Sequence, residues 1–199
     1  GTFHEGLRVT DEATLEITLM ALAGQVNKKI VVAAQQQGVR AVGISGLDGG
    51  LIHANLYRDG ALGRVGEVSR VETGVLEALT ASGFIPVVSP LGLGPDGEPL
   101  NINADTSAAA IAAALKADRL VFLTNVDGLL DGDGKTIAHI TPDGIEELKA
   151  AGVITQGMIP KMESALSALQ NGVGQVEIRN AAYGEGTKLK GARNVETVC

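Results

Sequence analysis

The chain has 199 residues, of which 45% are apolar and 20% charged, so it can bury a core and is not a disordered chain. Its net charge of −7 repels phosphate backbones, so a nucleic-acid partner is not expected. No apolar run approaches the roughly 20 residues of a membrane span, so a membrane partner is not expected either. The single cysteine, Cys199, excludes an intramolecular disulfide and a cysteine zinc site and favours a reducing cytoplasm.

A long amphipathic helix is predicted near the start of the chain. Thr10 is the expected capping residue, and two acidic residues follow it where the helix dipole favours negative charge. The helix is expected to end near Gln37, and Gly24 is a point at which it could break or kink. Its apolar face is formed, at spacings of three and four, by Leu15, Leu19, Leu22, Val26 and Ile30.

The rest of the chain alternates between strand and helix patterns. Strands are predicted at 39–45, 84–89, 119–124 and 173–178, and helices at 71–81, 105–115, 141–151 and 159–169. Asp59-Gly60 is typical of a hairpin turn between strands at 51–57 and 62–68, and the tail after Asn180 shows no clear period. This alternation predicts an α/β fold with a mostly parallel central sheet sandwiched by helices, together with the β-hairpin.

Two glycine-containing motifs are interpreted as turns. Residues 92–97 formally match GxGxxG, but no helix begins at the third glycine, so dinucleotide binding is rejected. Residues 131–134 resemble half of a calcium loop but lack the third ligand position and the closing glutamate. The histidines have no ligand-like spacing either, so no resident metal site is expected.

Two segments leave a functional and a structural interpretation open. In extended backbone Asn101 and Asn103 point to the same side, and Asp105 is expected to cap the following helix. They form either a strand-end ligand site or a cap with two turn asparagines. Lys161 lies beside the positive end of a helix that begins around Pro160, and is either an exposed lysine or half of an anion site completed by backbone amides.

Five segments together resemble the amino-acid kinase family, and within it the members that phosphorylate N-acetylglutamate in arginine biosynthesis. In the family order, these segments are GLRVTDEATLE (6–16), GQVNKKIV (24–31), GFIPVVSPLGLGPDGEPLNINAD (83–105), LTNVDGLL (123–130) and GVITQGMIPK (152–161). The resemblance implies a phosphotransferase that uses ATP, with Mg²⁺ carried on the nucleotide, and phosphorylates the side-chain carboxylate of N-acetyl-L-glutamate. It also implies a partial substrate lobe in residues 1–104 and a nucleotide-binding lobe in residues 105–199.

The resemblance also implies roles for individual residues. Arg8 is expected to bind a substrate carboxylate, because its planar fork suits bidentate recognition. Asn101 and Asn103 are expected to face the substrate, Asp105 to organise the catalytic lysines, and Lys161 to stabilise the transferring phosphoryl group. The expected nucleotide contacts are Asn125, Val126, Asp127, Gly128, Leu129, Leu130, Val153, Ile154 and Thr155.

The chain departs from the family pattern at both ends. The strand, glycine-rich loop and second catalytic lysine with which the family opens do not precede Gly1, so this chain alone is expected to bind nucleotide weakly and to be poorly active. Gly186-Thr187 also arrives sooner after strand 173–178 than in the family. The alternatives are a non-catalytic nucleotide- or partner-binding module and a kinase for a carrier-linked aminoadipate. The resemblance further implies a homodimer formed through the long helix and a sheet edge.

Overall fold

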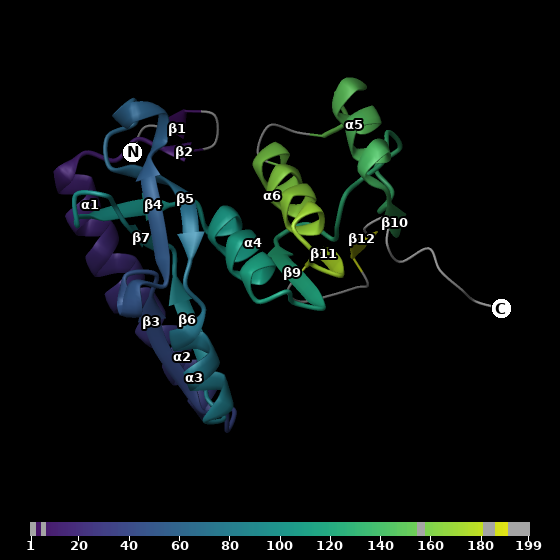
Figure 1. Ribbon diagram of the computed structural model, residues 1–199. Coiled ribbons are helices and arrows are strands. Elements are labelled where there is room, and N and C mark those ends of the chain that lie inside the picture. The colour runs from purple at the N-terminus through teal and green to yellow at the C-terminus, as the bar shows by residue number, and fades with distance from the viewer. Residues whose placement is uncertain (1–2, 5–6, 155–157, 181–185, 191–199) are drawn as a thin grey trace. The chain divides into compact units, whose positions relative to one another are not determined.

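The computed structural model describes residues 3–4, 7–154, 158–180 and 186–190, and it divides the chain into two compact units (Figure 1). The first unit is Gly1–Ala110 and the second is Ile111–Cys199. Helix α4 (Ala104–Ala114) leads along the chain from one unit into the other. Each unit is built around its own hydrogen-bonded strands.

The first unit opens with one continuous helix in three segments. They are α1 (Glu12–Thr18), the π-helical η1 (Leu19–Val26) and α2 (Asn27–Gln36). The cap is Asp11 rather than Thr10, because the Asp11 side chain accepts a hydrogen bond from the Thr14 backbone N–H at 2.8 Å. Gly24 lies inside the π-helical segment, so the helix does not break there.

The helix Glu12–Gln36 is long and apolar enough to cross a membrane by length and composition alone, contrary to the expectation from the sequence. It has 25 residues and a mean hydropathy of 1.2 over its most apolar window. Helices that pack on the core of a globular unit meet the same criteria. Here the side chain of Asn27, in the middle of the helix, donates hydrogen bonds to Ile44 O and Val87 O on two strands of the first unit.

Those two strands, β3 (Ala41–Ser45) and β6 (Ile85–Ser89), pair in parallel, and α3 (Gly74–Ala81) leads into β6. The predicted helix at 71–81 is therefore wrong in its first three residues. Val71 belongs to the end of a strand and pairs with Ile52.

A small closed barrel holds the core of the first unit. Its strands are β4 (Ile52–Leu56), β5 (Val65–Val71), β7 (Leu91–Leu93) and β8 (Pro99–Ile102). The antiparallel pair β4–β5 confirms the predicted hairpin, although its connection is the 3₁₀ turn η3 (Tyr57–Gly60). The GxGxxG match begins in β7 with Gly92 and continues through the turn between β7 and β8, so it does not open a helix. The buried cluster inside the barrel is Ala54, Leu100 and Ile102.

Two short elements complete the first unit. Strands β1 (Phe3–His4) and β2 (Leu7–Arg8) form an antiparallel pair, and η2 (Asp48–Gly50) is a 3₁₀ turn after β3. The Asp48 carboxylate accepts hydrogen bonds from the backbone N–H and the hydroxyl of Ser45, both at 2.7 Å, which fixes this turn at the end of the strand.

The second unit is a four-stranded sheet with helices. Its strands are β9 (Arg119–Thr124), β10 (His139–Ile140), β11 (Gln175–Asn180) and β12 (Thr187–Lys190), in the order β10-β12-β11-β9. The helices α5 (Pro142–Ala150) and α6 (Ile159–Gln170) agree with their predicted ranges to within about a turn. Strand β12 was not foreseen in the tail after Asn180. It pairs antiparallel with β11 and parallel with β10.

The α/β prediction with parallel strand pairing and a hairpin is thus confirmed. Parallel pairs occur in both units, as β3–β6 in the first and β9–β11 in the second. Parallel strands carry ligand sites where several of them end, so the carboxyl ends of these strands are the places to examine for a site.

Candidate active site

The Arg8 segment is tied to the asparagine segment although 91 residues separate them. Thr10, which is fully buried, donates a hydrogen bond from its hydroxyl to the Arg8 carbonyl oxygen at 2.9 Å. The Asn101 side-chain amide donates to the Thr10 hydroxyl at 3.1 Å. One buried hydroxyl therefore fixes the backbone at Arg8 and the side chain of Asn101 together. Sequence reasoning missed this role of Thr10, which it assigned to a helix cap.

Thr10 holds its position because its backbone lies very close to the backbone of residues 62–64. Arg64 N donates to Thr10 O at 2.6 Å, and Thr10 N donates to Leu62 O at 3.0 Å. Gly63 lies between these partners with φ of +71°, and a Cβ there would collide with the Thr10 carbonyl oxygen. Glycine is therefore required at 63 for the Arg8 segment to reach the barrel. The Arg8 side chain itself is exposed at the end of β2.

Asn103, not Asp105, caps α4. The Asn103 Oδ1 accepts a hydrogen bond from the Thr106 backbone N–H at 3.1 Å, which is the geometry of an N-cap. Asp105 lies in the first turn of α4 and is half-buried. The expectation that Asp105 caps the helix is wrong because the helix begins one residue earlier, at Ala104. A carboxylate in a first turn is still favoured by the helix dipole.

In the second unit, polar side chains gather at the carboxyl ends of β9 and β11. Thr124 and Asn180 are register partners at the last position of each strand. The Asn180 amide donates to the Asp127 carboxylate at 3.1 Å, and the Thr124 hydroxyl donates to Asn125 Oδ1 at 3.3 Å. Sequence reasoning did not select Asn180, whose only signal was its place at the end of a strand.

A hydrogen bond to β12 fixes the backbone of the loop that begins at Asn125. Leu129 N donates to the hydroxyl of the buried Thr187 on β12 at 2.8 Å. Gly128 has φ of +147°, and a Cβ there would lie 2.7 Å from Thr187 Oγ1. The backbone at Gly128 and Leu129 is therefore in a fixed place, while Asp127 and Leu130 remain exposed.

The Asp131–Gly134 segment is a turn, as expected. The Asp131 carboxylate accepts hydrogen bonds from the backbone N–H groups of Asp133 and Lys135, at 3.0 and 2.9 Å. This local bonding explains the aspartate without a cation. No group of three or more His, Cys, Asp or Glu side chains that could hold a metal ion occurs in the part of the chain that the structure describes.

The remaining residues that were predicted to lie near the nucleotide precede α6 or belong to its first turn. Val153 is half-buried and Ile154 buried at the end of the segment that follows α5, whereas Thr155 lies outside the described residues. Lys161 lies in the first turn of α6, which has no acidic residue there. Its ammonium nitrogen is 4.9 Å from the ring centroid of Phe122, a buried residue of β9. The face of the Phe122 ring attracts the Lys161 ammonium group and holds it next to β9.

The predicted site residues therefore fall into two sets. Arg8, Asn101 and Asp105 belong to the first unit, and Lys161 with the Asn125 loop belongs to the second. Within the first unit, the structure brings the backbone of Arg8 to Asn101 through Thr10. The convergence of the two sets on one substrate stays a prediction.

Known proteins resemble the chain over most of its length. Residues 2–180 match the amino acid kinase family. The chain is 47% identical over 187 residues to acetylglutamate kinase from Methanopyrus kandleri, covering 89% of this chain and 76% of that protein. With acetylglutamate kinase from Dinoroseobacter shibae the identity is 52% over 171 residues, covering 86% of this chain but only 59% of the relative's length. A crystal structure of a Streptococcus mutans UA159 protein matches with a TM-score of 0.88 and 35% identity, over 95% of this chain and 76% of that one.

Proposed function

The chain belongs to the amino acid kinase family, and from that premise we propose that it transfers a phosphoryl group from ATP to the side-chain carboxylate of N-acetyl-L-glutamate. The proposal is supported by the acetylglutamate kinases at 47% and 52% identity. It places substrate recognition in residues 1–104 and nucleotide binding in residues 105–199.

Phosphoryl transfer to a carboxylate requires the kinds of side chain that the candidate site contains. A carboxylate nucleophile is already ionised near neutral pH, so the reaction needs no general base. What it needs is alignment of two anions and neutralisation of charge on the transferring group. In the proposal, Arg8 pairs with a substrate carboxylate and Lys161 faces the transferring phosphoryl group. Asn101 and Asn103 orient the substrate, and Asp105 orients the lysine.

The observation that carries the proposal is the position of Lys161 at the amino end of α6. The amino end of a helix attracts anions, and a lysine in its first turn adds a positive charge at the same place. The helix amides and the ammonium together would hold a phosphoryl oxygen. The contact with the Phe122 ring keeps the lysine in that region before the phosphate arrives.

ATP is the phosphoryl donor in this proposal, and Mg²⁺ arrives with it. The ion is held mainly by phosphate oxygens and water, which is its usual mode in kinases. The nucleotide contacts the loop from Asn125 to Leu130 and the segment from Val153 to Thr155. The exposed side chains of Asn125 and Asp127 are polar groups that this loop presents to solvent.

The test is acyl-phosphate formation, trapped with hydroxylamine, from ATP and N-acetylglutamate. Lys161→Ala is expected to lower the rate by a factor on the order of 10² to 10³, the usual loss on removing one charge-stabilising group. Lys135→Ala, which removes an exposed lysine from the turn after Gly134, is the matched control and leaves the rate unchanged. Equal rates for Lys161→Ala and the unaltered chain would contradict the assigned role.

Two other outcomes of this assay would favour one of the two alternative functions. Binding of ATP without any acyl phosphate supports a non-catalytic nucleotide-binding module. Turnover with a carrier-linked aminoadipate in preference to N-acetylglutamate supports the related kinase.

The proposal includes a cytoplasmic homodimer. Large apolar side chains are exposed along the helix Glu12–Gln36, among them Ile17 at 62% and Met20 at 66%. Burying such side chains against a second copy would remove apolar surface from water.

A further inference from the structure

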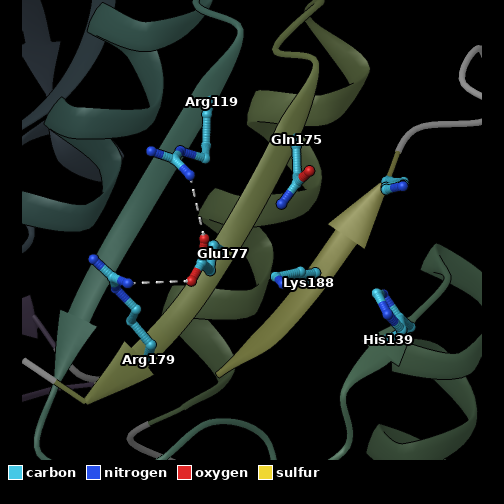
Figure 2. Close-up of a pocket in the computed structure, with 7 residues that line it drawn as sticks. Arg119, His139, Gln175, Glu177, Arg179 and Lys188 are labelled. Atoms are coloured by element: carbon cyan, nitrogen blue, oxygen red, sulfur yellow. Dashed lines mark ion pairs between the residues drawn. The ribbon is translucent and has the colours of Figure 1, made fainter. Parts of the chain in front are cut away.

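One face of the sheet in the second unit carries polar side chains on all four of its strands. Gln175 on β11 is the register partner of Arg119 on β9 and of Lys190 on β12, which makes one row across the sheet. Glu177 is the partner of Lys188, which is also the partner of His139 on β10, and these make a second row. Alternate residues of a strand share a face, so both rows lie on the same side, as Figure 2 shows.

This face is hollowed into a depression. The two rows and Arg179 line a space of about 490 Å³ (Figure 2). The other face of β11 carries Val176 and Ile178, which are fully buried on the side packed by α6. The two faces of β11 therefore differ, because one is apolar and packed by α6 and the other is polar and lines the depression.

The depression is positively charged although the chain is acidic overall. Its only carboxylate belongs to Glu177, whose side chain is 5% exposed and lies in the floor. That carboxylate pairs with Arg119 at 3.9 Å and with Arg179 at 3.7 Å. The two arginine side chains are 63% and 45% exposed, so the negative charge is buried while the guanidinium groups remain open to solvent.

The two lysines add charge without a counterion. Lys188 is half-buried and Lys190 exposed, and neither forms an ion pair within residues 3–4, 7–154, 158–180 and 186–190. Four permanent cations thus face one buried carboxylate in a chain whose net charge is −7. Concentrating cations in one hollow raises the local concentration of anions there.

The spacing of the cations indicates a ligand with more than one anionic group. Neighbouring strands lie about 4.8 Å apart, so Arg119 and Lys190, which flank β11, are separated by about 10 Å at the backbone. A single small anion cannot contact both ends of such a row. We propose that this depression binds a small molecule carrying at least two oxyanion groups, held by the guanidinium groups of Arg119 and Arg179 and the ammonium groups of Lys188 and Lys190.

This site is separate from the proposed kinase site. Arg119 and Gln175 open β9 and β11, whereas the proposed nucleotide contacts follow the carboxyl ends of those strands at Thr124 and Asn180. Of the proposed cations on these two strands, only Arg179 lies near that carboxyl end, and Arg119 lies at the opposite end. Five residues of strand at about 3.3 Å each place the two ends about 16 Å apart. A ligand in the depression would therefore act on the protein without occupying the catalytic groups.

Calorimetric titration with sodium tripolyphosphate and with citrate tests the proposal and distinguishes phosphate from carboxylate ligands. The unaltered chain is expected to bind at least one of them, and Lys188→Gln/Lys190→Gln to bind it about tenfold or more weakly. The matched control, Lys116→Gln/Lys135→Gln, removes the same charge from exposed lysines outside the depression and binds as the unaltered chain does. No binding by the unaltered chain up to about 5 mM, or equal binding by the first double variant, overturns the proposal.

Two single variants make the test independent of folding defects and of the kinase site. Glu177→Gln removes the buried negative charge while keeping the side chain's shape, and is expected to tighten binding about threefold or more. Lys161→Ala is expected to leave unchanged the part of the binding that Lys188→Gln/Lys190→Gln removes. Loss of binding in Lys161→Ala would assign the anion to the kinase site, and unchanged or weaker binding in Glu177→Gln would remove the basis for the depression. Failure of the kinase assay affects neither result.

Discussion

At the scale of single residues, Asn27 shows how one buried polar group locates a long helix. The side chain is 2% exposed, and its amide donates to Ile44 O, Val87 O and Ser89 Oγ at 2.8 to 3.1 Å. The Ser89 hydroxyl in turn donates to Leu22 O in the π-helical segment. Because an unpaired buried polar group is costly, these bonds specify one position of the helix against β3 and β6.

We expect Asn27→Leu to lower the free energy of unfolding by about 2–4 kcal/mol, because it leaves buried acceptors without a donor. Gln36→Leu, at the exposed end of the same helix, should change it by less than about 0.5 kcal/mol. Urea unfolding followed by circular dichroism measures both. A loss in Asn27→Leu no larger than that in Gln36→Leu would show that the helix is not held by this residue.

At the scale of elements, an ion pair joins the turn between β7 and β8 to Arg64, the residue that precedes β5. Arg64 donates a hydrogen bond to the Asp96 carboxylate at 2.9 Å. That hydrogen bond, followed by one from the Glu98 backbone N–H, lowers the pKa of Asp96 below its ordinary value of 3.8. The pKa of Arg64 is raised by the same partner, so the arginine stays charged.

The ion pair between Arg64 and Asp96 should make the free energy of unfolding depend on pH only under acidic conditions. The folded-state pKa of Asp96 is depressed, so the stabilisation is present above 3.8 and is lost as the pH falls through the folded value. We expect Asp96→Asn to have a lower urea midpoint than the unaltered chain near pH 6, with the difference shrinking at about pH 3 and below. Asp133→Asn, at an exposed turn, is the control. A difference that is the same at both pH values would contradict the role of the ion pair.

Local patterns predicted most elements, and non-local pairing explains the errors. The strand at Arg119–Thr124 and the helix at Ile159–Gln170 follow from runs of apolar or periodically apolar residues. Strand β12 has four residues, and Thr187–Lys190 becomes a strand only because β10 and β11 pair with it. Val71 was assigned to a helix because its pairing with Ile52 is invisible to a local pattern.

Arg8, Asn101 and Lys161 were selected as site residues through the family resemblance, and their roles stay predictions. No local pattern indicated Thr10 as the hydroxyl between Arg8 and Asn101, or Asn180 as the partner of Asp127, because these contacts join segments 91 and 53 residues apart. The cap was misplaced by two residues, from Asn103 to Asp105, which is the usual uncertainty of a helix boundary.

At the scale of the whole molecule, the proposed homodimer depends on the exposed apolar side chains of the first helix. Met20 is 66% exposed on the π-helical segment. We expect Met20→Glu to convert a dimer into a monomer in sedimentation velocity at micromolar concentration, because it would place a charge in an apolar contact. Glu16→Gln on the same helix should leave the dimer intact. A monomer in the unaltered chain would contradict the proposal.

The central claim is that Arg8 and Lys161 act on one substrate, although they belong to different units of the chain. A crystal structure of the chain with N-acetylglutamate and a non-hydrolysable ATP analogue measures this directly. We predict a substrate carboxylate within hydrogen-bond distance of the Arg8 guanidinium and the terminal phosphate beside the Lys161 ammonium. Ligands bound on separate surfaces, with neither side chain in contact with them, would contradict the account.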